Sequence, residues 1–432
     1  MISENIGTNS SGRLTFAGRD TVELCEKYGT PLMLMDEERI RENCRVYKSA
    51  MSEFMGGESR PLFAGKSCCF RQLYRIMAEE GMCADIVSPG ELYTANSAGF
   101  PMERAFFHGN NKTDADIAYA MDCGMGHFIV DNEDELCAVA AEAGRRGKVQ
   151  DILLRLTPGI DPHTQAKIST GKVDSKFGVA IETGQALEFC RKALSLENVR
   201  LKGFHCHIGS QIFEYKPFSD AADIMLRFIK KLRDELGYTA QILNLGGGFG
   251  VPYVESDPKI DYRENIKGLA GEIKQQCAAL DIPQPDILME PGRSIVADSG
   301  MTLYTVGSVK TISGYKSYVS VDGGMTDNPR FALYGSAYTV YVAERPNDAA
   351  DFRADVAGRC CESGDIIQED VPMPKPVRGE HIAVAVTGAY NYSMASNYNR
   401  IPRPPVIMLK GDGTEYTAVR RESYEDLCRN EL

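Results

Sequence analysis

The chain has 432 residues, of which 43% are hydrophobic and 25% charged, values that are ordinary for a globular protein large enough for two domains. Its net charge of -12 argues against a nucleic-acid partner, because neutralising a phosphate backbone needs a basic surface. No apolar run approaches the roughly 20 residues of a membrane-spanning helix, and the start, MISENIGTNSSGRL, lacks the basic and apolar regions of a signal peptide.

The first predicted element is a strand at 12–18. From about residue 60 to 290, short β-branched apolar runs then alternate with helical patterns. The strand candidates are PLFAGK (61–66), CADIVS (83–88), RAFFHG (104–109), HFIVD (127–131), DILLRL (151–156), VRLKGFHCHI (199–208), ILNLGG (242–247) and DILMEPG (286–292). Amphipathic helices are predicted at 91–98, 116–123 (after a possible N-cap, Thr113), 133–145, 183–196, 220–235 and 262–280. This alternation favours a closed barrel over an open doubly wound sheet.

After about residue 300 the pattern changes to β-rich segments punctuated by glycine and proline: TLYTVGSVKTI, KSYVSVDGG, EHIAVAVTGAY and PPVIMLKG. These segments indicate an antiparallel β domain, which the early strand joins. The predicted fold class is therefore α/β, with a (β/α)8 TIM barrel at 36–298 and a C-terminal antiparallel β domain. Residues 1–35 and 299–432 are expected to form that β-rich domain.

The 13 cysteines are odd in number, scattered, and form no CxxC pair. The vicinal pairs Cys68-Cys69 and Cys360-Cys361 do not have the spacing of zinc ligands. A secreted protein rarely leaves so many thiols unpaired, so the composition indicates a reducing, cytoplasmic location.

In a barrel, reactive groups lie at the C-terminal ends of the strands. The polar residues and glycines near such ends are Lys66, Asp85, Ser88, His108, His205, His207, Gly246, Gly247, Gly248 and Glu290. LGGGFG (245–250) is typical either of a plain tight turn or of a backbone cradle for a phosphate, since only glycine allows so close an approach. It lacks the Lys-Ser/Thr of a P-loop and the spacing of GxGxxG, which argues against a nucleotide.

Lys66 is either a surface lysine whose amine reaches solvent or a desolvated nucleophile that bonds to a carbonyl carbon. Glu290 is either an ordinary helix-start acid or ion-pair partner, or a carboxylate that keeps a pyridine nitrogen protonated. Together, a phosphate cradle, a lysine and a carboxylate at strand ends suggest pyridoxal 5'-phosphate.

Two further motifs leave alternatives open. His205 and His207 lie on the same face of a strand, but the six histidines of the chain supply no third metal ligand with convincing spacing. We therefore predict no metal and expect one histidine to pack against an aromatic cofactor. The thiols of CCESGD (360–365) are either buried structural cysteines or proton donors.

Taken in order, these motifs resemble the diaminopimelate decarboxylase family, in the form found in Gram-positive bacteria, within the alanine-racemase-like (fold type III) pyridoxal phosphate enzymes. The resemblance covers about residues 30 to 425 and includes ADIVSPGELYTANSAGFP, HGNNK, VDNEDEL, LRLTPGIDPHT, DSKFG, GFHCHIGSQIF, LNLGGGFG, MEPGRSIV, VDGGMTDNPRFALYG, CCESGD and TGAYNYSMASNYNRIPRPP. Two departures are Phe331, where proline is usual, and Pro89, where glycine is common.

The resemblance implies roles for particular residues. Lys66 carries the cofactor, His207 stacks on its ring, and Glu290 holds the pyridine nitrogen. The other cofactor-binding residues implied are Asp85, Ser210, Gly246, Gly247, Gly248, Gly292, Arg293 and Tyr390, of which Ser210 and the glycines bind the phosphate. The substrate-binding residues implied are Arg293, Arg330, Tyr334, Glu362 and Tyr390. Cys361 joins Lys66 and His207 as a catalytic residue, because it returns a proton to the reacting carbon.

In this family the residues at Cys361 and Glu362 complete the site of the partner subunit, which implies a homodimer. The activity implied is decarboxylation of the amino acid meso-2,6-diaminopimelate to L-lysine and carbon dioxide, the last step of lysine biosynthesis. The alternative is a related decarboxylase acting on ornithine, arginine or carboxynorspermidine, although Glu362 with Arg330 and Tyr334 suits a substrate ending in both an amine and a carboxylate. A non-catalytic regulator would tend to lose Lys66 or Glu290, and both are present.

Overall fold

The computed structural model describes residues 1–160 and 175–432. The motifs LRLTPGIDPHT and DSKFG therefore lie partly outside the described residues. The chain forms two compact units. The barrel unit consists of Asn43–Gly250 and Lys259–Gly292, and the β unit consists of Met1–Glu42, Val251–Pro258 and Arg293–Leu432.

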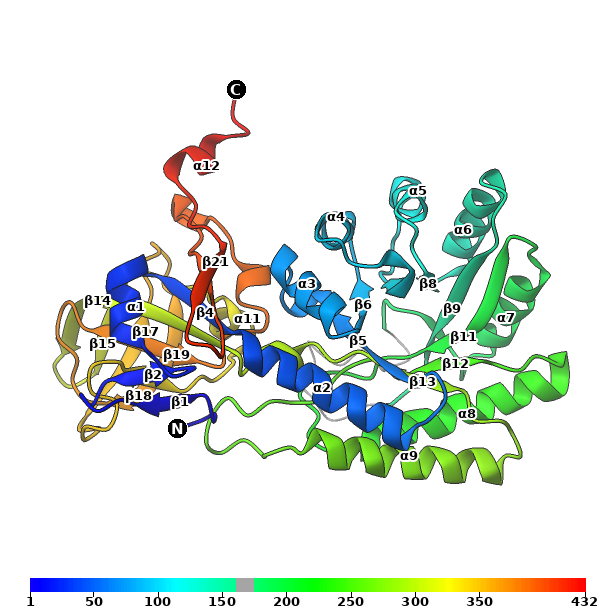
Figure 1. The fold of residues 1–432 in the computed structure, drawn as a ribbon, viewed down its shortest axis with the longest axis horizontal. Helices are drawn as coiled ribbons and strands as arrows, with labels where there is room; N and C mark the ends of the chain where they lie inside the picture. The colour runs from blue at the N-terminus through cyan, green and yellow to red at the C-terminus, as the bar shows by residue number, and fades with distance from the viewer. Residues whose placement is uncertain (161–174) are drawn as a thin grey trace. The chain divides into compact units, whose positions relative to one another are not determined.

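The barrel unit is built on eight parallel strands that close into a ring (Figure 1). In ring order they are β5 (Arg60–Ala64), β6 (Cys83–Ile86), β7 (Ala105–Phe107), β8 (His127–Val130), β9 (Gln150–Thr157), β11 (Val199–His205), β12 (Ile242–Asn244) and β13 (Asp286–Met289). The ring closes because β13 pairs with β5, and a short strand, β10 (Val179–Ala180), pairs with β9. All eight predicted barrel strands are confirmed.

Helices connect the strands and cover the outside of the ring. They are α3 (Arg71–Glu79), α4 (Pro89–Ser97), α5 (Asp114–Asp122), α6 (Glu133–Arg145), α7 (Gln185–Ser195), α8 (Lys216–Leu236) and α9 (Tyr262–Ala279), and α2 (Glu37–Phe54) precedes β5. Thr113 caps α5, as predicted, in a reciprocal capping box with Asp116. Ser88 accepts a hydrogen bond from the Glu91 backbone N–H, so this strand-end serine serves as a helix cap.

The interior of the barrel is filled by an apolar layer. Its buried side chains come from seven different strands: Leu62, Cys83, Phe106, Ile129, Leu153, Ile242 and Leu288. A filled interior makes the barrel a packed core and not a pore, so polar groups at its two ends belong to separate sites.

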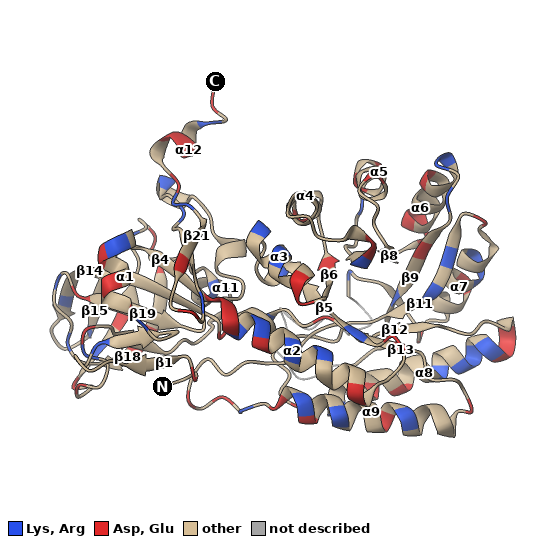
Figure 2. Cartoon of the chain, viewed as in Figure 1, with Lys and Arg blue, Asp and Glu red and all other residues tan. Residues whose placement is uncertain are grey.

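Charges of both signs alternate along the outer helices, as Figure 2 shows for α8 and α9. On α8, Lys216 pairs with Asp220 and Lys230 with Asp234, each one helical turn apart. Among the described residues, no helix is both long enough and apolar enough to cross a membrane.

The β unit contains a nine-stranded, mostly antiparallel sheet. Its strands are β4 (Leu32–Asp36), β14 (Gly300–Ile312), β15 (Lys316–Val321), β16 (Val340–Val342), β17 (Phe352–Ala357), β18 (Ile366–Met373), β19 (His381–Ala385), β20 (Val406–Leu409) and β21 (Glu415–Val419). The predicted β-rich segments are confirmed. The N-terminus joins this unit through β4, which pairs with β14 and β20.

The early strand predicted at 12–18 is β2 (Leu14–Phe16), and it belongs to a separate three-stranded sheet with β1 (Ile6–Thr8) and β3 (Arg19–Asp20). The helices of the β unit are short: α1 (Thr21–Tyr28), α10 (Arg293–Val296), α11 (Arg330–Tyr334) and α12 (Tyr424–Cys428).

Candidate active site

Lys66 lies at the C-terminal end of β5, in a single 3-10 turn formed by Gly65–Ser67. Its side chain is exposed although its neighbours Gly65 and Ser67 are buried. Burial lowers the pKa of His207 well below its usual value; the charge of Lys66 lowers it further, and the charge of Glu290 opposes that change. The charges of both Lys66 and Glu290 therefore act on His207.

Glu290 follows β13 and is surrounded by polar side chains from the ends of three other strands. Its Oε1 accepts a hydrogen bond from Asn244 Nδ2 at 2.8 Å and lies 3.0 Å from His108 Nε2, and its Oε2 lies 3.4 Å from His205 Nε2. Burial would raise the pKa of Glu290, but the two histidines hold it well below its usual value. Burial also lowers the pKa of His205 to about 4, so this imidazole is neutral at neutral pH and donates through Nε2. The result is a buried carboxylate that stays ionised.

Asp85, at the end of β6, lies beside this group. Its Oδ1 is 3.7 Å from His108 Nε2. Burial raises the pKa of the Asp85 carboxyl, His108 and Lys66 oppose the rise, and Glu290 adds to it. Two neighbouring carboxyl groups with opposite pKa shifts indicate a site where one acid stays ionised and the other retains a proton more readily.

The same side chains also have a geometry that suits a metal ion. One ligand atom from each of His108, His205 and Glu290 lies within 4.8 Å of the other two. The sequence offered no third ligand because His108 and Glu290 are distant in the chain from His205 and meet it only in the barrel. A carboxylate bonded to Asn244 and flanked by two imidazoles accounts for the same arrangement without an ion, so the absence of a metal stays a prediction.

The glycine stretch after β12 lies beside the loop that follows β11. Ile212 N–H donates to Gly248 O at 3.0 Å, and Gly250 N–H donates to Ile212 O at 2.9 Å. Ser210 and the glycines are thereby brought into neighbouring loops. Gly246 and Gly248 have φ values of 70° and 137°, which side chains rarely tolerate.

No side chain fits in this stretch. A Cβ on Gly247 would lie 2.0 Å from Glu290 O, and one on Gly246 would lie 2.8 Å from His207 Nδ1. A Cβ on Gly292 would lie 2.9 Å from Ala64 Cβ, so this backbone packs against the strand that leads to Lys66. A bare backbone for a phosphate, an exposed lysine and an ionised buried acid at one barrel mouth fit pyridoxal phosphate.

In the β unit, a second group gathers around two buried arginines. Arg293 Nη1 donates to Tyr253 Oη at 2.7 Å, and Arg330 Nη1 donates to Tyr338 Oη at 3.1 Å. Both guanidinium groups also lie over the ring of Tyr390, at 4.8 and 5.8 Å from its centroid. The structure therefore brings together the predicted residues Arg293, Arg330 and Tyr390.

The positive charges of this arginine group favour the binding of an anion. Burial raises the pKa of Tyr253, but the two guanidinium groups outweigh burial and lower it overall. Within the described part of the chain, no carboxylate lies at ion-pair distance from Arg330, which is only 6% exposed. A buried guanidinium of this kind is well suited to bind a ligand carboxylate.

Among the described residues, no hydrogen bond or ion pair links the predicted residues Tyr334, Cys361 and Glu362 to these groups. Tyr334 is half-buried at the end of α11, and Tyr338 is the tyrosine whose hydroxyl contacts Arg330. Cys361 and Glu362 are exposed in the turn between β17 and β18, where Cys361 N–H donates to Asn399 Oδ1 at 2.7 Å.

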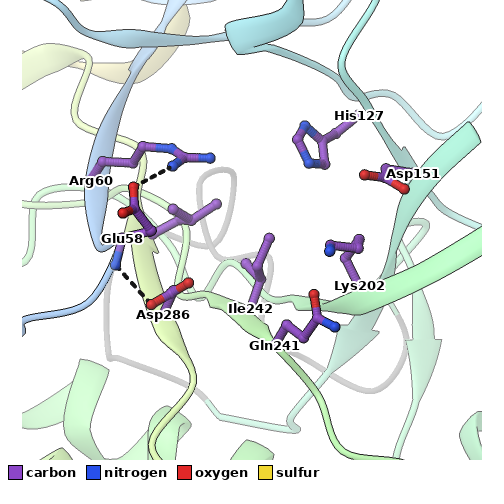
Figure 3. Close-up of a pocket in the computed structure, with 9 residues that line it drawn as sticks. Glu58, Arg60, His127, Asp151, Lys202, Gln241, Ile242 and Asp286 are labelled. Carbon is purple, nitrogen blue, oxygen red and sulfur yellow. Dashed lines mark hydrogen bonds and ion pairs between the residues drawn. The ribbon is translucent and has the colours of Figure 1, made fainter.

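A polar pocket of about 240 Å³ lies at the opposite ends of the barrel strands (Figure 3). Arg60, His127, Asp151 and Asp286, which line it, belong to the first two residues of their strands. Acidic and basic side chains are mixed around this pocket, and the apolar layer separates it from Lys66 and Glu290. It is therefore not the candidate active site.

Sequence reasoning missed several residues that the structure adds. In the barrel unit they are Asn244, Glu91, which accepts a hydrogen bond from Val87 N–H at 2.8 Å, and Arg155, whose charge acts on Asp85. Asn244 and Arg155 lie near strand ends, which was the available signal. In the β unit, the missed residues are Tyr253, Tyr338 and Asn391; Asn391 directly follows the predicted Tyr390, Tyr338 is four residues after the predicted Tyr334, and only Tyr253 lies far in sequence from a predicted residue.

Comparison with known proteins identifies the family. Residues 37–297 match the family described as pyridoxal-dependent decarboxylase, pyridoxal binding domain. The diaminopimelate decarboxylase of Halalkalibacterium halodurans is 44% identical over 424 residues, covering 98% of this chain and 96% of that protein. The corresponding protein of Bacillus subtilis is 42% identical over 424 residues, with the same coverage of both chains.

Comparison with solved structures supports the same family. The crystal structure of diaminopimelate decarboxylase from M. jannaschii in complex with L-lysine has a TM-score of 0.91 and 34% identity, covering 99% of this chain and 98% of that one. The enzyme from Helicobacter pylori, complexed with L-lysine, has a TM-score of 0.86 and 32% identity, covering 95% and 99%. The chain belongs to the diaminopimelate decarboxylase family of pyridoxal-dependent decarboxylases.

Proposed function

We propose that the chain catalyses the pyridoxal phosphate-dependent decarboxylation of meso-2,6-diaminopimelate to L-lysine and carbon dioxide, the last step of lysine biosynthesis. The observation that carries this proposal is the buried Glu290 carboxylate, which accepts a hydrogen bond from Asn244 at the same barrel mouth as the exposed Lys66. The relatives that bear the name of this activity, and the two related structures that contain L-lysine, support the choice of substrate.

Pyridoxal phosphate, when bound, accepts the electron pair that departing carbon dioxide leaves behind. The residues of this chain would hold and tune it. The Lys66 amine would carry the cofactor, Glu290 would keep its ring nitrogen protonated, and His207 would pack against its ring. The phosphate is held by Ser210, Gly246, Gly247, Gly248 and the Gly292 backbone. Asp85 would join this set from the end of β6, where its Oδ1 lies 3.7 Å from His108 Nε2.

The arginine group would bind the substrate end that does not react. Arg330 and Arg293 offer planar donors to the remote carboxylate, and Tyr334 and Tyr390 complete the proposed set. Binding energy at this end orients the reacting carbon without contacting it. Ornithine and arginine have no second carboxylate, so a buried guanidinium without an acidic partner favours diaminopimelate over them.

We further propose a homodimer in which Cys361 and Glu362 complete the partner's site. The Cys361 thiol returns a proton to the reacting carbon, and Glu362 binds the remote ammonium group. Their exposure in the single chain supports this role, because a residue that serves a second subunit must be accessible before assembly. Mixing Lys66→Ala and Cys361→Ala proteins should restore part of the activity through hybrid dimers. Failure to recover activity after confirmed subunit exchange would reject shared sites.

We also propose the boundaries of the two domains and a cytoplasmic location for the protein. The match of residues 37–297 to a pyridoxal binding domain supports a cofactor-binding domain at 36–298, with 1–35 and 299–432 as the β-rich domain. A cytoplasmic location is supported by the 13 cysteines, all of which lie in the described part of the chain and are free thiols.

The decisive experiment is a product assay with meso-diaminopimelate, ornithine, arginine and carboxynorspermidine under identical conditions. Lysine should form from diaminopimelate with a kcat/KM at least about 100-fold above that for any other substrate, since a site built around a polar group discriminates strongly against substrates that lack it. Preferential formation of a diamine would replace this proposal by the alternative.

A further inference from the structure

Asn244 joins two parts of the proposed cofactor site. It is the last residue of β12 and is completely buried. Its Oδ1 accepts the Gly246 N–H at 2.9 Å, and its Nδ2 donates to Glu290 Oε1 at 2.8 Å. One planar amide group therefore links the glycine stretch to the acid proposed to hold the ring nitrogen.

The orientation of this amide group follows from its partners. A backbone N–H can only donate and a carboxylate can only accept, so Oδ1 must face Gly246 and Nδ2 must face Glu290. Backbone bonds reinforce the arrangement, because Glu290 N–H donates to Gly246 O and Cys206 N–H donates to Asn244 O, each at 2.9 Å. Rotating the amide by half a turn would break both side-chain bonds.

The bond to Asn244 also determines which oxygen of Glu290 stays available. Oε1 receives Asn244 and has His108 Nε2 at 3.0 Å, whereas Oε2 has the longer 3.4 Å approach of His205. A carboxylate oxygen has about two lone-pair positions. Oε1 is therefore the more crowded oxygen, and Oε2 is the more open to a further donor.

We propose that Asn244 is a positioning residue that holds the glycine stretch and the Glu290 carboxylate at one fixed spacing, so that the phosphate and the ring nitrogen of a single cofactor bind together. This proposal rests on the proposed function, because it assumes that these two groups bind the two ends of pyridoxal phosphate. Asn244 acts through its neighbours and has no catalytic role.

Asn244→Asp is the sharpest test because it changes one atom. The new carboxyl still accepts the Gly246 N–H, but it donates to Glu290 only while it is protonated. Two carboxyl groups this close share a proton at low pH and repel one another once both ionise. The variant should therefore bind cofactor normally at low pH and poorly at high pH.

Cofactor-free wild type and variant are titrated with pyridoxal phosphate by equilibrium dialysis from about pH 6 to about pH 9, a range chosen because such carboxyl pairs have raised pKa values. At each pH the Kd of Asn244→Asp is divided by the Kd of wild type. This ratio should increase about ten- to hundredfold from the low-pH end of the range to the high-pH end, because one hydrogen bond to a charged group is lost. Asn244→Ala, which loses both bonds at every pH, should bind weakly throughout, without recovery at low pH. Asn96→Asp, the same chemical change on the exposed face of α4, should match wild type.

The outcomes separate the two proposals. If wild type binds cofactor and Asn244→Asp follows the same pH profile with the same Kd, the positioning role is rejected and the proposed function stands. If Asn244→Asp does not fold, wild-type binding by Asn244→Ala rejects the positioning role equally. If wild type itself takes up no cofactor, the proposed function fails first.

Discussion

Replacing Arg330 by methionine removes a guanidinium group while keeping a long, flexible side chain. In the structure Arg330 is 6% exposed, donates to Tyr338 at 3.1 Å, and lies 5.3 Å from the centroid of the Tyr253 ring. Methionine preserves much of the packing against these tyrosines. The variant should therefore fold, and its defect should be weaker binding of the remote carboxylate of the substrate.

The size of the effect follows from the bonds lost. A hydrogen bond to a charged group contributes about 1.5–3 kcal/mol, and a guanidinium–carboxylate pair has two of them. Binding also removes water from the substrate carboxylate, and this desolvation cost offsets part of the free energy gained from the two bonds. We expect a net loss of about 3 kcal/mol, which corresponds to a fall of about 100-fold or slightly more in kcat/KM for diaminopimelate.

Steady-state kinetics with diaminopimelate measure this loss, and thermal unfolding verifies the fold. Arg353→Met is the matched control, because Arg353 lies on the exposed part of β17 and pairs only at the surface with Asp370, at 2.6 Å. It should leave kcat/KM unchanged. If Arg330→Met keeps a kcat/KM within about threefold of wild type, Arg330 does not bind the substrate carboxylate and the choice of substrate loses its structural basis.

Three further predictions follow from the same structure. Lys66→Ala should abolish turnover, since no other amine is proposed to carry the cofactor; more than trace activity in a product assay would contradict that role. Cys361→Ala should lower kcat by about 100-fold or more with little change in KM, as expected for loss of a proton donor, and an unchanged kcat would exclude it. Glu91→Gln tests pH-dependent stability: burial raises the pKa of Glu91 from 4.5 to about 7, so its contribution to stability is full below pH 4.5 and is lost as the pH rises through 7. The free energy of unfolding, measured with urea on the cofactor-free protein, should fall less for the variant than for wild type between about pH 5 and pH 8, by about 1–3 kcal/mol. If the two proteins lose the same free energy of unfolding over this range, the raised pKa of Glu91 is wrong.

The barrel was predictable because its strands carry a strong local signal. DILLRL and DILMEPG are buried on both faces, so they appear in the sequence as continuous apolar runs and not as alternating ones. The structure places them in β9 and β13, with Leu153 and Leu288 in the apolar layer. Helix α3 was missed although Leu73 and Met77 follow a helical period, and α2 was missed as well.

The candidate site was only partly predictable. Lys66, His207 and Glu290 are reactive side chain types at strand ends, and the rule that barrel sites lie there placed them among ten candidates. Only the family resemblance chose His207 over His205. Asn244 ends a strand too, but an amide gives no chemical signal until its two partners are known. Tyr253 lies in 251–258, between two barrel elements, yet packs with Arg293 in the β unit. Such contacts join residues far apart in the chain, and no local pattern predicts them.

The functions of Cys361 and Glu362 could not be predicted from the fold of a single chain. Both are exposed in the single chain, so neither its burial pattern nor its contacts assign them a function. Their proposed role depends on a second copy of the chain, which only the family resemblance suggested.

The most direct test of the central claim is to locate the lysine that bears the cofactor. Borohydride reduction of the cofactor-loaded enzyme makes the bond between cofactor and lysine permanent, and peptide mapping by mass spectrometry then identifies that lysine. The modification should lie on the peptide containing Lys66 and should be lost in Lys66→Ala. Modification of any other lysine in the wild-type enzyme would contradict the proposed role of Lys66.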